Sequence, residues 1–149
     1  MKNQRRDSGQ SLVEFALIFP LAFFLITGFL DLGRAVFYYS SLTNAVREGT
    51  RYAIVHKDEI NDAFNNPTDN SLQDKVLEYA FGLTGTPDPL TKDDIFVTIE
   101  KVNNLFRTVS IEATYPFKPI TPGIKELFSS TEGIDLTVQS KMHVTPGSM

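Results

Sequence analysis

One long run of apolar residues dominates the N-terminal part of the chain, from Leu12 to Leu30. Glu14 is its only ionisable residue, and most of the others are Leu, Ile, Val or Phe, which each contribute about -0.3 to -0.6 kcal/mol to membrane insertion. A carboxylate near the end of a span costs less than the roughly 3 kcal/mol expected at the bilayer centre, so insertion is favoured. We therefore predict a transmembrane helix over residues 10–30. A bend is expected near Pro20, which lacks a backbone donor.

The charges on either side of the run predict the orientation of this helix. Three cations precede it, Lys2, Arg5 and Arg6, whereas Asp31 and Arg34 nearly cancel after it. The positive-inside bias places residues 1–9 in the cytosol as a leader and residues 31–149 outside the membrane. A cleaved secretory signal fits less well, because the run is long and lacks a small-x-small site. A soluble core helix is disfavoured, because Phe and Leu cover every face.

Apolar positions continue beyond the span at alternating intervals of four and three residues, which predicts that the helix extends from about Ser11 to Val55. The apolar stripe consists of Ala35, Tyr39, Leu42, Val46, Gly49 and Ala53. The charged residues fall mainly on the other faces: Asp31, Arg34, Arg47, Glu48 and Arg51. A glycine costs up to about 1 kcal/mol of helix propensity, so we expect Gly49 to allow close approach of a sheet.

The remaining pattern predicts one more helix and three strands. The helix is expected over residues 71–83, with a capping box at its start. Strands are expected over residues 95–102, 107–115 and 134–144, where apolar and polar residues alternate, with Asn103-Asn104 as the first hairpin turn. We therefore predict an α+β fold in which the long helix packs on a small three-stranded antiparallel sheet.

A proline-containing segment separates the second and third predicted strands, from Pro116 to Phe128. Its prolines are expected to interrupt strand pairing. Its apolar residues form a short face made of Ile120, Ile124, Leu127 and Phe128. This face either caps the sheet or touches the bilayer or a neighbouring subunit.

Composition narrows the possible functions. The 149-residue chain has a net charge of -4 and no cysteine, which excludes disulfides and thiolate metal sites. Mild acidity argues against a nucleic-acid partner, because phosphate binding needs clustered cations. There is no Ser-His-Asp pattern, phosphate loop or HExxH motif, so we predict no enzymatic activity, cofactor or small-molecule substrate. A set of metal-ligand residue types occurs in one polar stretch, where a solvated connector is the preferred interpretation: His56, Asp58, Glu59 and Asp62.

Two motifs resemble a known family. Gly9 precedes Glu14 by five residues, between the basic leader and the apolar run, which resembles the class III signal of type IV pilin-like proteins. That resemblance implies that a prepilin peptidase cuts between Gly9 and Gln10. The stretch NAVREGTRYA, residues 44–53, resembles the A-REGARYA segment of TadE-like pseudopilins, the minor pilins of tight-adherence pili. Its matching positions are Arg47, Glu48, Gly49, Arg51 and Tyr52.

Two departures favour a minor pilin over a shaft-forming one. Phe15 stands where the small major pilins usually carry tyrosine, and the chain is far longer than those pilins. The resemblance implies a pilin-like fold and a single-pass protein of the bacterial cytoplasmic membrane that enters a surface pilus. Its implied partners are the membrane, the prepilin peptidase, other pilins and the pilus-assembly platform proteins.

Glu14 has two interpretations. In one it snorkels to the membrane interface and has no further role. In the other, which the family resemblance implies, it pairs with the new N-terminal amine of a neighbouring subunit and sets the register of assembly. The charges of Arg47, Glu48 and Arg51 are interpreted as a solvated face rather than a binding site. The alternative function is an unprocessed, bitopic membrane anchor that displays a small interaction domain.

Overall fold

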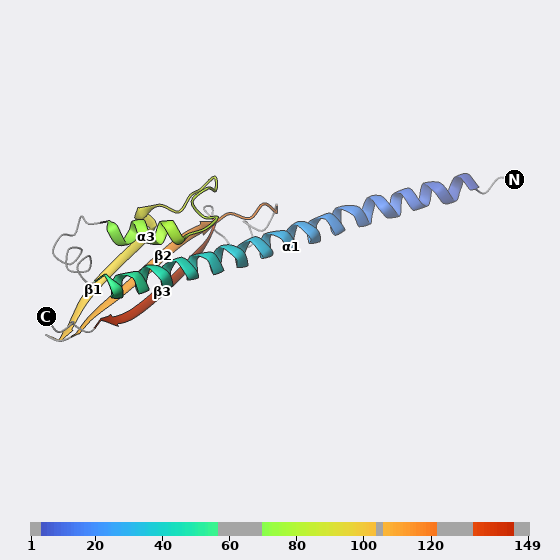
Figure 1. Cartoon of the computed structure of the whole chain (residues 1–149). Helices are drawn as coiled ribbons and strands as arrows, with labels where there is room; N and C mark the ends of the chain where they lie inside the picture. The colour runs from blue at the N-terminus through green and yellow to red at the C-terminus, as the bar shows by residue number, and fades with distance from the viewer. Residues whose placement is uncertain (1–3, 57–69, 104–105, 122–132, 145–149) are drawn as a thin grey trace.

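The computed structural model of the chain describes residues 4–56, 70–103, 106–121 and 133–144. Helix α1, Gln4–Val55, is continuous over 52 residues and begins earlier than predicted. Its N-terminal half projects away from the rest of the molecule, and its C-terminal half lies along a small α+β domain (Figure 1). The helix assignment continues on both sides of Pro20, so the bend expected there stays a prediction.

The three strands form one antiparallel sheet in the order β1-β2-β3, as the α+β prediction requires. They are β1, Ile95–Asn103; β2, Phe106–Phe117; and β3, Ile134–Val144. In register, Ile95 lies opposite Ala113, which lies opposite Val138, and all three are buried. Phe96, one residue along β1, is exposed. The alternation therefore buries one face of the sheet, as predicted. The residues following Asn103 in the expected hairpin turn lie outside the described residues.

Strand β2 continues through Pro116 to Phe117, where we expected proline to end the pairing. Pro116 lies opposite Asp135 of β3. On the other side, β1 pairs with β2 only as far as Ala113. Beyond that residue β2 has an unpaired side, and proline is tolerated at such a position because no ladder hydrogen bond is lost there.

Helix α3, Ser71–Tyr79, is shorter than predicted, because the chain leaves the helix at Ala80 and Gly82 takes a left-handed φ of 77°. The capping box expected at its start does not form, since the N-cap is Asn70 and makes no side-chain cap hydrogen bond. A capping interaction occurs instead at the short 3-10 helix η1, Lys92–Asp94, where the amide of Thr91 donates to Asp94 Oδ2 at 2.8 Å.

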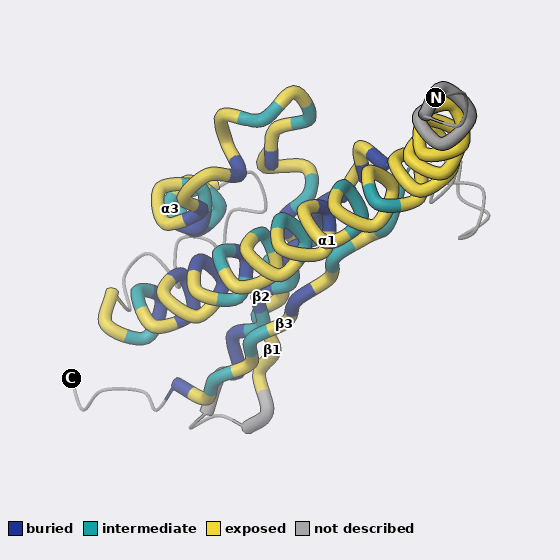
Figure 2. Tube along the Cα trace, turned by 90° about the vertical axis from the view of Figure 1, so that its right-hand side faces the viewer, coloured by how far each residue is buried: buried dark blue, intermediate teal, exposed yellow. Residues whose placement is uncertain are grey.

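The core lies between the two helices and the buried face of the sheet. Helix α1 packs against β2 and β3, and α3 packs against α1 and β1. Figure 2 shows the buried positions on the part of α1 that lies beside the sheet and α3, whereas its N-terminal half is exposed. The largest fully buried side chains come from all three parts: Leu42, Val46, Leu72, Val76, Val109 and Ile111.

The predicted apolar stripe is largely correct, with one error. Leu42, Val46, Gly49 and Ala53 are buried, but Tyr39 is 50% exposed. Tyr38 takes its place, with its ring 5.3 Å from that of Tyr115 and 6.0 Å from that of Phe117. Gly49 does sit at a close approach, but the nearest contact is with α3 rather than with the sheet. A Cβ there would collide with Val76 Cγ2 and would lie 3.5 Å from Ile111 Cδ1 of β2.

Candidate functional site

The predicted cleavage and recognition residues lie near the N-terminal end of α1. Gly9 has open space around the position of a Cβ, with no atom within 4 Å. Gln10 and Glu14 are one helical turn apart, and the Gln10 side-chain amide donates to Glu14 Oε1 at 3.3 Å. Both side chains are exposed, as is Phe15. The backbone of Arg5 and Arg6 belongs to the same helix, and Lys2 lies outside the described residues.

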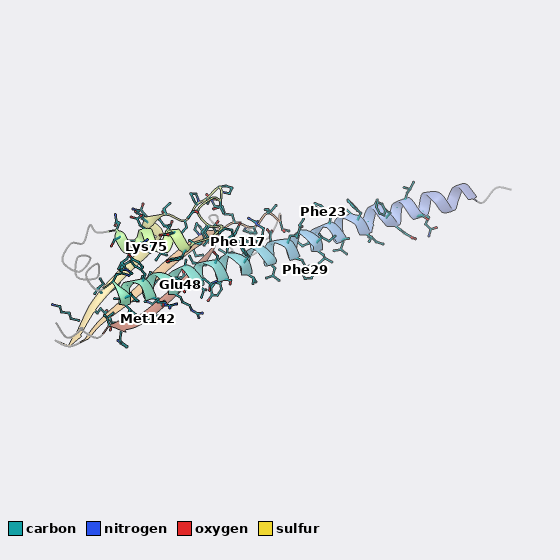
Figure 3. The ribbon with its side chains drawn as sticks, viewed as in Figure 1. Phe23, Phe29, Glu48, Lys75, Phe117 and Met142 are labelled. Carbon is teal, nitrogen blue, oxygen red and sulfur yellow. The ribbon has the colours of Figure 1, made fainter. Side chains whose placement is uncertain are left out.

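The apolar run after Glu14 is almost entirely uncovered by the rest of the chain. The large apolar side chains from Leu12 to Leu30 are exposed, and Phe23 and Phe29 project from different sides of α1 (Figure 3). Helix α1 contains a segment long and apolar enough to cross a membrane. An apolar surface of this extent is stable only against lipid or against other apolar helices.

The segment that resembles the family motif divides into a buried and an exposed set. Gly49 and Thr50 are buried, and Thr50 Oγ1 donates to the carbonyl of Val46 at 2.7 Å. Arg47 and Glu48 are exposed. Arg51 Nη1 lies 3.9 Å from Glu48 Oε1, and both groups are exposed, so the pair contributes little to stability.

Tyr52, the last residue of that motif, is half-buried between two side chains. Its ring stacks on His56 with the centroids 3.9 Å apart, and Lys75 Nζ lies 5.3 Å from the Tyr52 centroid. Figure 3 shows Lys75 on α3 and Glu48 on α1, in the half of the molecule that carries the folded domain.

A buried carboxylate occupies the point where α1 leaves the predicted span. Asp31, expected on a face away from the domain, is only 4% exposed. Its Oδ1 accepts from the amide of Ile120 at 3.0 Å and from Arg34 Nη1 at 3.1 Å. Its Oδ2 accepts from the amide of Thr121 at 2.7 Å and from Thr121 Oγ1 at 2.6 Å. We call these four residues, Asp31, Arg34, Ile120 and Thr121, the exit junction.

The electrostatics of the exit junction favour a charged carboxylate. Burial raises the pKa of Asp31, but the hydrogen bonds from Thr121, Ile120 and Arg34 outweigh it, and the pKa is lowered below its ordinary value. The Arg34 guanidinium lies 5.6 Å from the Tyr38 ring centroid and 5.5 Å from that of Phe117. The carboxylate, the guanidinium and the aromatic rings therefore join the middle of α1, just after the apolar run, to the end of β2 and the residues that follow it.

Comparison with known proteins finds a similarity in the N-terminal region. Residues 9–51, less than half of the chain, match the family model described as TadE-like protein. No curated protein and no solved structure matches the chain. The matched range lies wholly within α1, from Gly9 through Arg51, and the sheet and α3 lie beyond it.

The part of α1 that is long and apolar enough to cross a membrane overlaps the range that matches the TadE-like model. The match includes Gly9, Gln10 and Glu14 at one end and the Arg47–Arg51 stretch at the other. The structure holds these two groups apart along one helix, so they do not form a common site.

Asp31 and Arg34 of the exit junction lie within the matched range, whereas Ile120 and Thr121 lie beyond it, and the junction was not predicted from the sequence. One signal was present, since Asp31 precedes Ala35, Tyr38 and Leu42 at intervals of four, three and four, on the same stripe. Its partners carried no signal, because two of its four hydrogen bonds come from backbone amides that any residue supplies.

Of the four metal-ligand residue types in the polar stretch, where a solvated connector was preferred, only His56 is among the described residues. His56 is exposed, with Nδ1 3.1 Å from the carbonyl oxygen of Tyr52, while Asp58, Glu59 and Asp62 lie outside the described residues. Among the described residues, no three His, Cys, Asp or Glu side chains are grouped to hold a metal ion.

Proposed function

We propose that this TadE-like protein is a minor pilin or pseudopilin that acts in assembly of a tight-adherence pilus and is cut by a prepilin peptidase after Gly9. The observation that carries the proposal is the uncovered apolar half of α1, with a single carboxylate, Glu14, near its start. The beginning of the family match at Gly9 supports the same cleavage point.

Cleavage changes the energetics of moving this helix. While the leader is attached, extraction of α1 drags Lys2, Arg5 and Arg6 into hydrocarbon, where each cation costs several kcal/mol. Cutting after Gly9 removes all three and leaves a new α-amine on Gln10. The apolar helix is then free to exchange lipid contacts for contacts with other helices.

Glu14 determines the height at which α1 docks against a neighbouring helix. Within the described part of the uncut chain, Glu14 accepts a hydrogen bond from the Gln10 side-chain amide at 3.3 Å, a neutral donor that offsets part of the desolvation of a carboxylate. A neighbouring subunit's α-amine supplies a charged donor, and such hydrogen bonds are about twice as strong as neutral ones. Docking at the correct height along the helix is therefore favoured over docking one turn away.

The proposed function also requires one orientation of the chain across the membrane. The N-terminus lies in the cytosol, the helix spans the cytoplasmic membrane, and the sheet domain lies outside, where it travels with α1 into the filament. Peptidase, other pilins and the assembly platform are the proposed partners.

Filament incorporation of Glu14 variants tests this function. Glu14→Ala and Glu14→Gln are expected to insert in the membrane at the wild-type level and to be absent from sheared filaments. Glu100→Ala is the matched control. Glu100 is an exposed carboxylate on β1 whose Oε2 lies 3.7 Å from the exposed Lys141 Nζ, and an exposed ion pair of this kind contributes little. This variant is expected to incorporate normally. Normal incorporation of both Glu14 variants would contradict the proposed role of the carboxylate. Absence of the wild-type chain from filaments, together with retention of its leader in peptidase-competent cells, would support the bitopic anchor instead.

A further inference from the structure

The segment that follows β2 is placed at the level where α1 leaves the membrane. The amide of Ile120 donates to Asp31 Oδ1 at 3.0 Å, and Asp31 directly follows Leu30, the last residue of the apolar run. In Figure 1 this segment extends from the end of β2 toward the N-terminal half of α1. Because the Ile120 amide is bonded to the residue that directly follows Leu30, Ile120 lies close to the end of the span.

Ile120 is also one of the most exposed large apolar side chains outside the span, at 72%. The residues around it are already engaged. Lys118 Nζ pairs with Asp88 Oδ1 at 2.7 Å, Pro119 is buried, and Thr121 is bound to Asp31. Ile120 thus projects from residues 118–121, whose other members are held in place, whereas Ile124, Leu127 and Phe128 of the predicted apolar face lie outside the described residues.

We infer that Ile120 contacts the outer leaflet of the membrane and that Asp31 is the positioning residue that holds it there. The polar interface on each side of the hydrocarbon is several Å thick, so a group bonded to the first residue after the apolar run lies at the level of this interface. The span brings lipid to this level in every inserted copy, whereas a neighbouring subunit is present only after assembly.

A contact of Ile120 with lipid has two structural consequences. The membrane contact fixes the height of the sheet domain, because the exit junction couples the segment after β2 to α1. The contact is apolar rather than ionic, since the ammonium of Lys118 already has a carboxylate partner. It should therefore be retained on zwitterionic lipid alone.

Site-directed fluorescence on the full chain tests the contact. Because the chain has no cysteine, each introduced cysteine is the sole labelling site. Ile120→Cys is compared with Leu30→Cys within the span and with Val55→Cys, which is 69% exposed at the far end of the same helix. The labelled chains are reconstituted at high lipid-to-protein ratio in phosphatidylcholine vesicles containing nitroxide-labelled lipid. We expect quenching at position 120 to reach at least half of that at position 30, with none at position 55.

Quenching at position 120 no greater than at position 55 would overturn the inference, as would quenching that depends on protein density but not on nitroxide lipid. Adding Asp31→Ala is expected to lower the quenching at position 120 at least two-fold and to leave that at position 30 unchanged. Thr121→Val, which removes only the 2.6 Å hydroxyl contact, provides the same comparison if Asp31→Ala disrupts the domain. If neither variant lowers the quenching, Asp31 does not position the segment. The test requires that α1 spans the membrane, but it requires neither cleavage nor pilus incorporation. Absence of quenching at position 30 would show that the predicted span itself is wrong.

Discussion

Asp31 and Thr121 are 90 positions apart in the chain and are joined by two hydrogen bonds to the same carboxylate oxygen, at 2.7 Å from the amide and 2.6 Å from the hydroxyl. The pair lies at the boundary between the apolar half of α1 and the folded domain. It therefore ties the segment after β2 to α1 at this boundary.

Removing the carboxylate is expected to destabilise the domain. Asp31→Ala should lower the free energy of unfolding by about 2 to 4 kcal/mol, because a hydrogen bond to a charged group contributes about 1.5 to 3 kcal/mol and two buried amides lose their acceptor. Thr121→Val removes one contact and should cost about 1 to 2 kcal/mol. Denaturant unfolding of the detergent-solubilised full chain measures both, and equal effects of the two variants would contradict this account.

The stabilisation from Asp31 should depend on pH in the acidic range only. The pKa of Asp31 is lowered in the folded state, so its contribution is complete above the unfolded-state value of about 3.9 and is lost as the pH falls through the lower, folded value. The difference in unfolding free energy between wild type and Asp31→Asn should be flat from pH 7 to about pH 5 and should shrink below about pH 4. A difference that grows on acidification would have the wrong sign.

Two adjacent tyrosines on α1 are expected to behave differently. Tyr38 packs on Tyr115 and Phe117, so Tyr38→Ala should cost about 2 to 4 kcal/mol. Tyr39 is exposed, and Tyr39→Ala should change the stability of the isolated chain by no more than about 0.5 kcal/mol. Thermal unfolding of the two variants side by side distinguishes the observed stripe from the one predicted with Tyr39.

Two glycines of α1 should respond to alanine with opposite signs. Gly49→Ala places a Cβ against Val76 and should destabilise by about 1 to 3 kcal/mol, despite the better helix propensity of alanine. Gly33 has no atom within 4 Å of a built Cβ, so Gly33→Ala should be neutral or stabilising by up to about 1 kcal/mol. Denaturant midpoints for the pair provide the comparison. A stabilised Gly49→Ala chain would show that α1 and α3 are not closely packed.

The parts of the fold with strong periodicity were predictable. The period-two pattern gave the three strands to within two residues, and the stripe through Leu42, Val46 and Ala53 predicted the packed face of α1. The predicted burial of Tyr39 was wrong, because a stripe that alternates between intervals of three and four residues passes equally near positions 38 and 39. The rings of Tyr115 and Phe117 decide between them, and those lie in a distant strand.

The apolar pattern predicted which positions are buried, but it did not show where the helix ends. Ala80 and Leu83 are both buried, as their spacing from Leu72 and Val76 predicted, yet α3 ends at Tyr79 because the chain turns at Gly82. The exit junction was harder still to predict from the sequence, since Asp31 is held by a long-range contact that depends on where β2 ends. At the N-terminus, the roles of Gly9, Gln10 and Glu14 come from their placement between the basic leader and the apolar run and stay predictions, and the structure adds the contact of Gln10 with Glu14.

The central claim is that the leader is removed after Gly9, and mass spectrometry of the N-terminal peptide tests it most directly. The protein is to be purified from cells with and without an active prepilin peptidase. The account predicts a chain that begins at Gln10 in peptidase-competent cells and at the initiating region, with Lys2, Arg5 and Arg6 retained, in peptidase-deficient cells. A chain that keeps its leader in peptidase-competent cells would contradict the claim and would leave a membrane-anchored domain that is not a processed pilin.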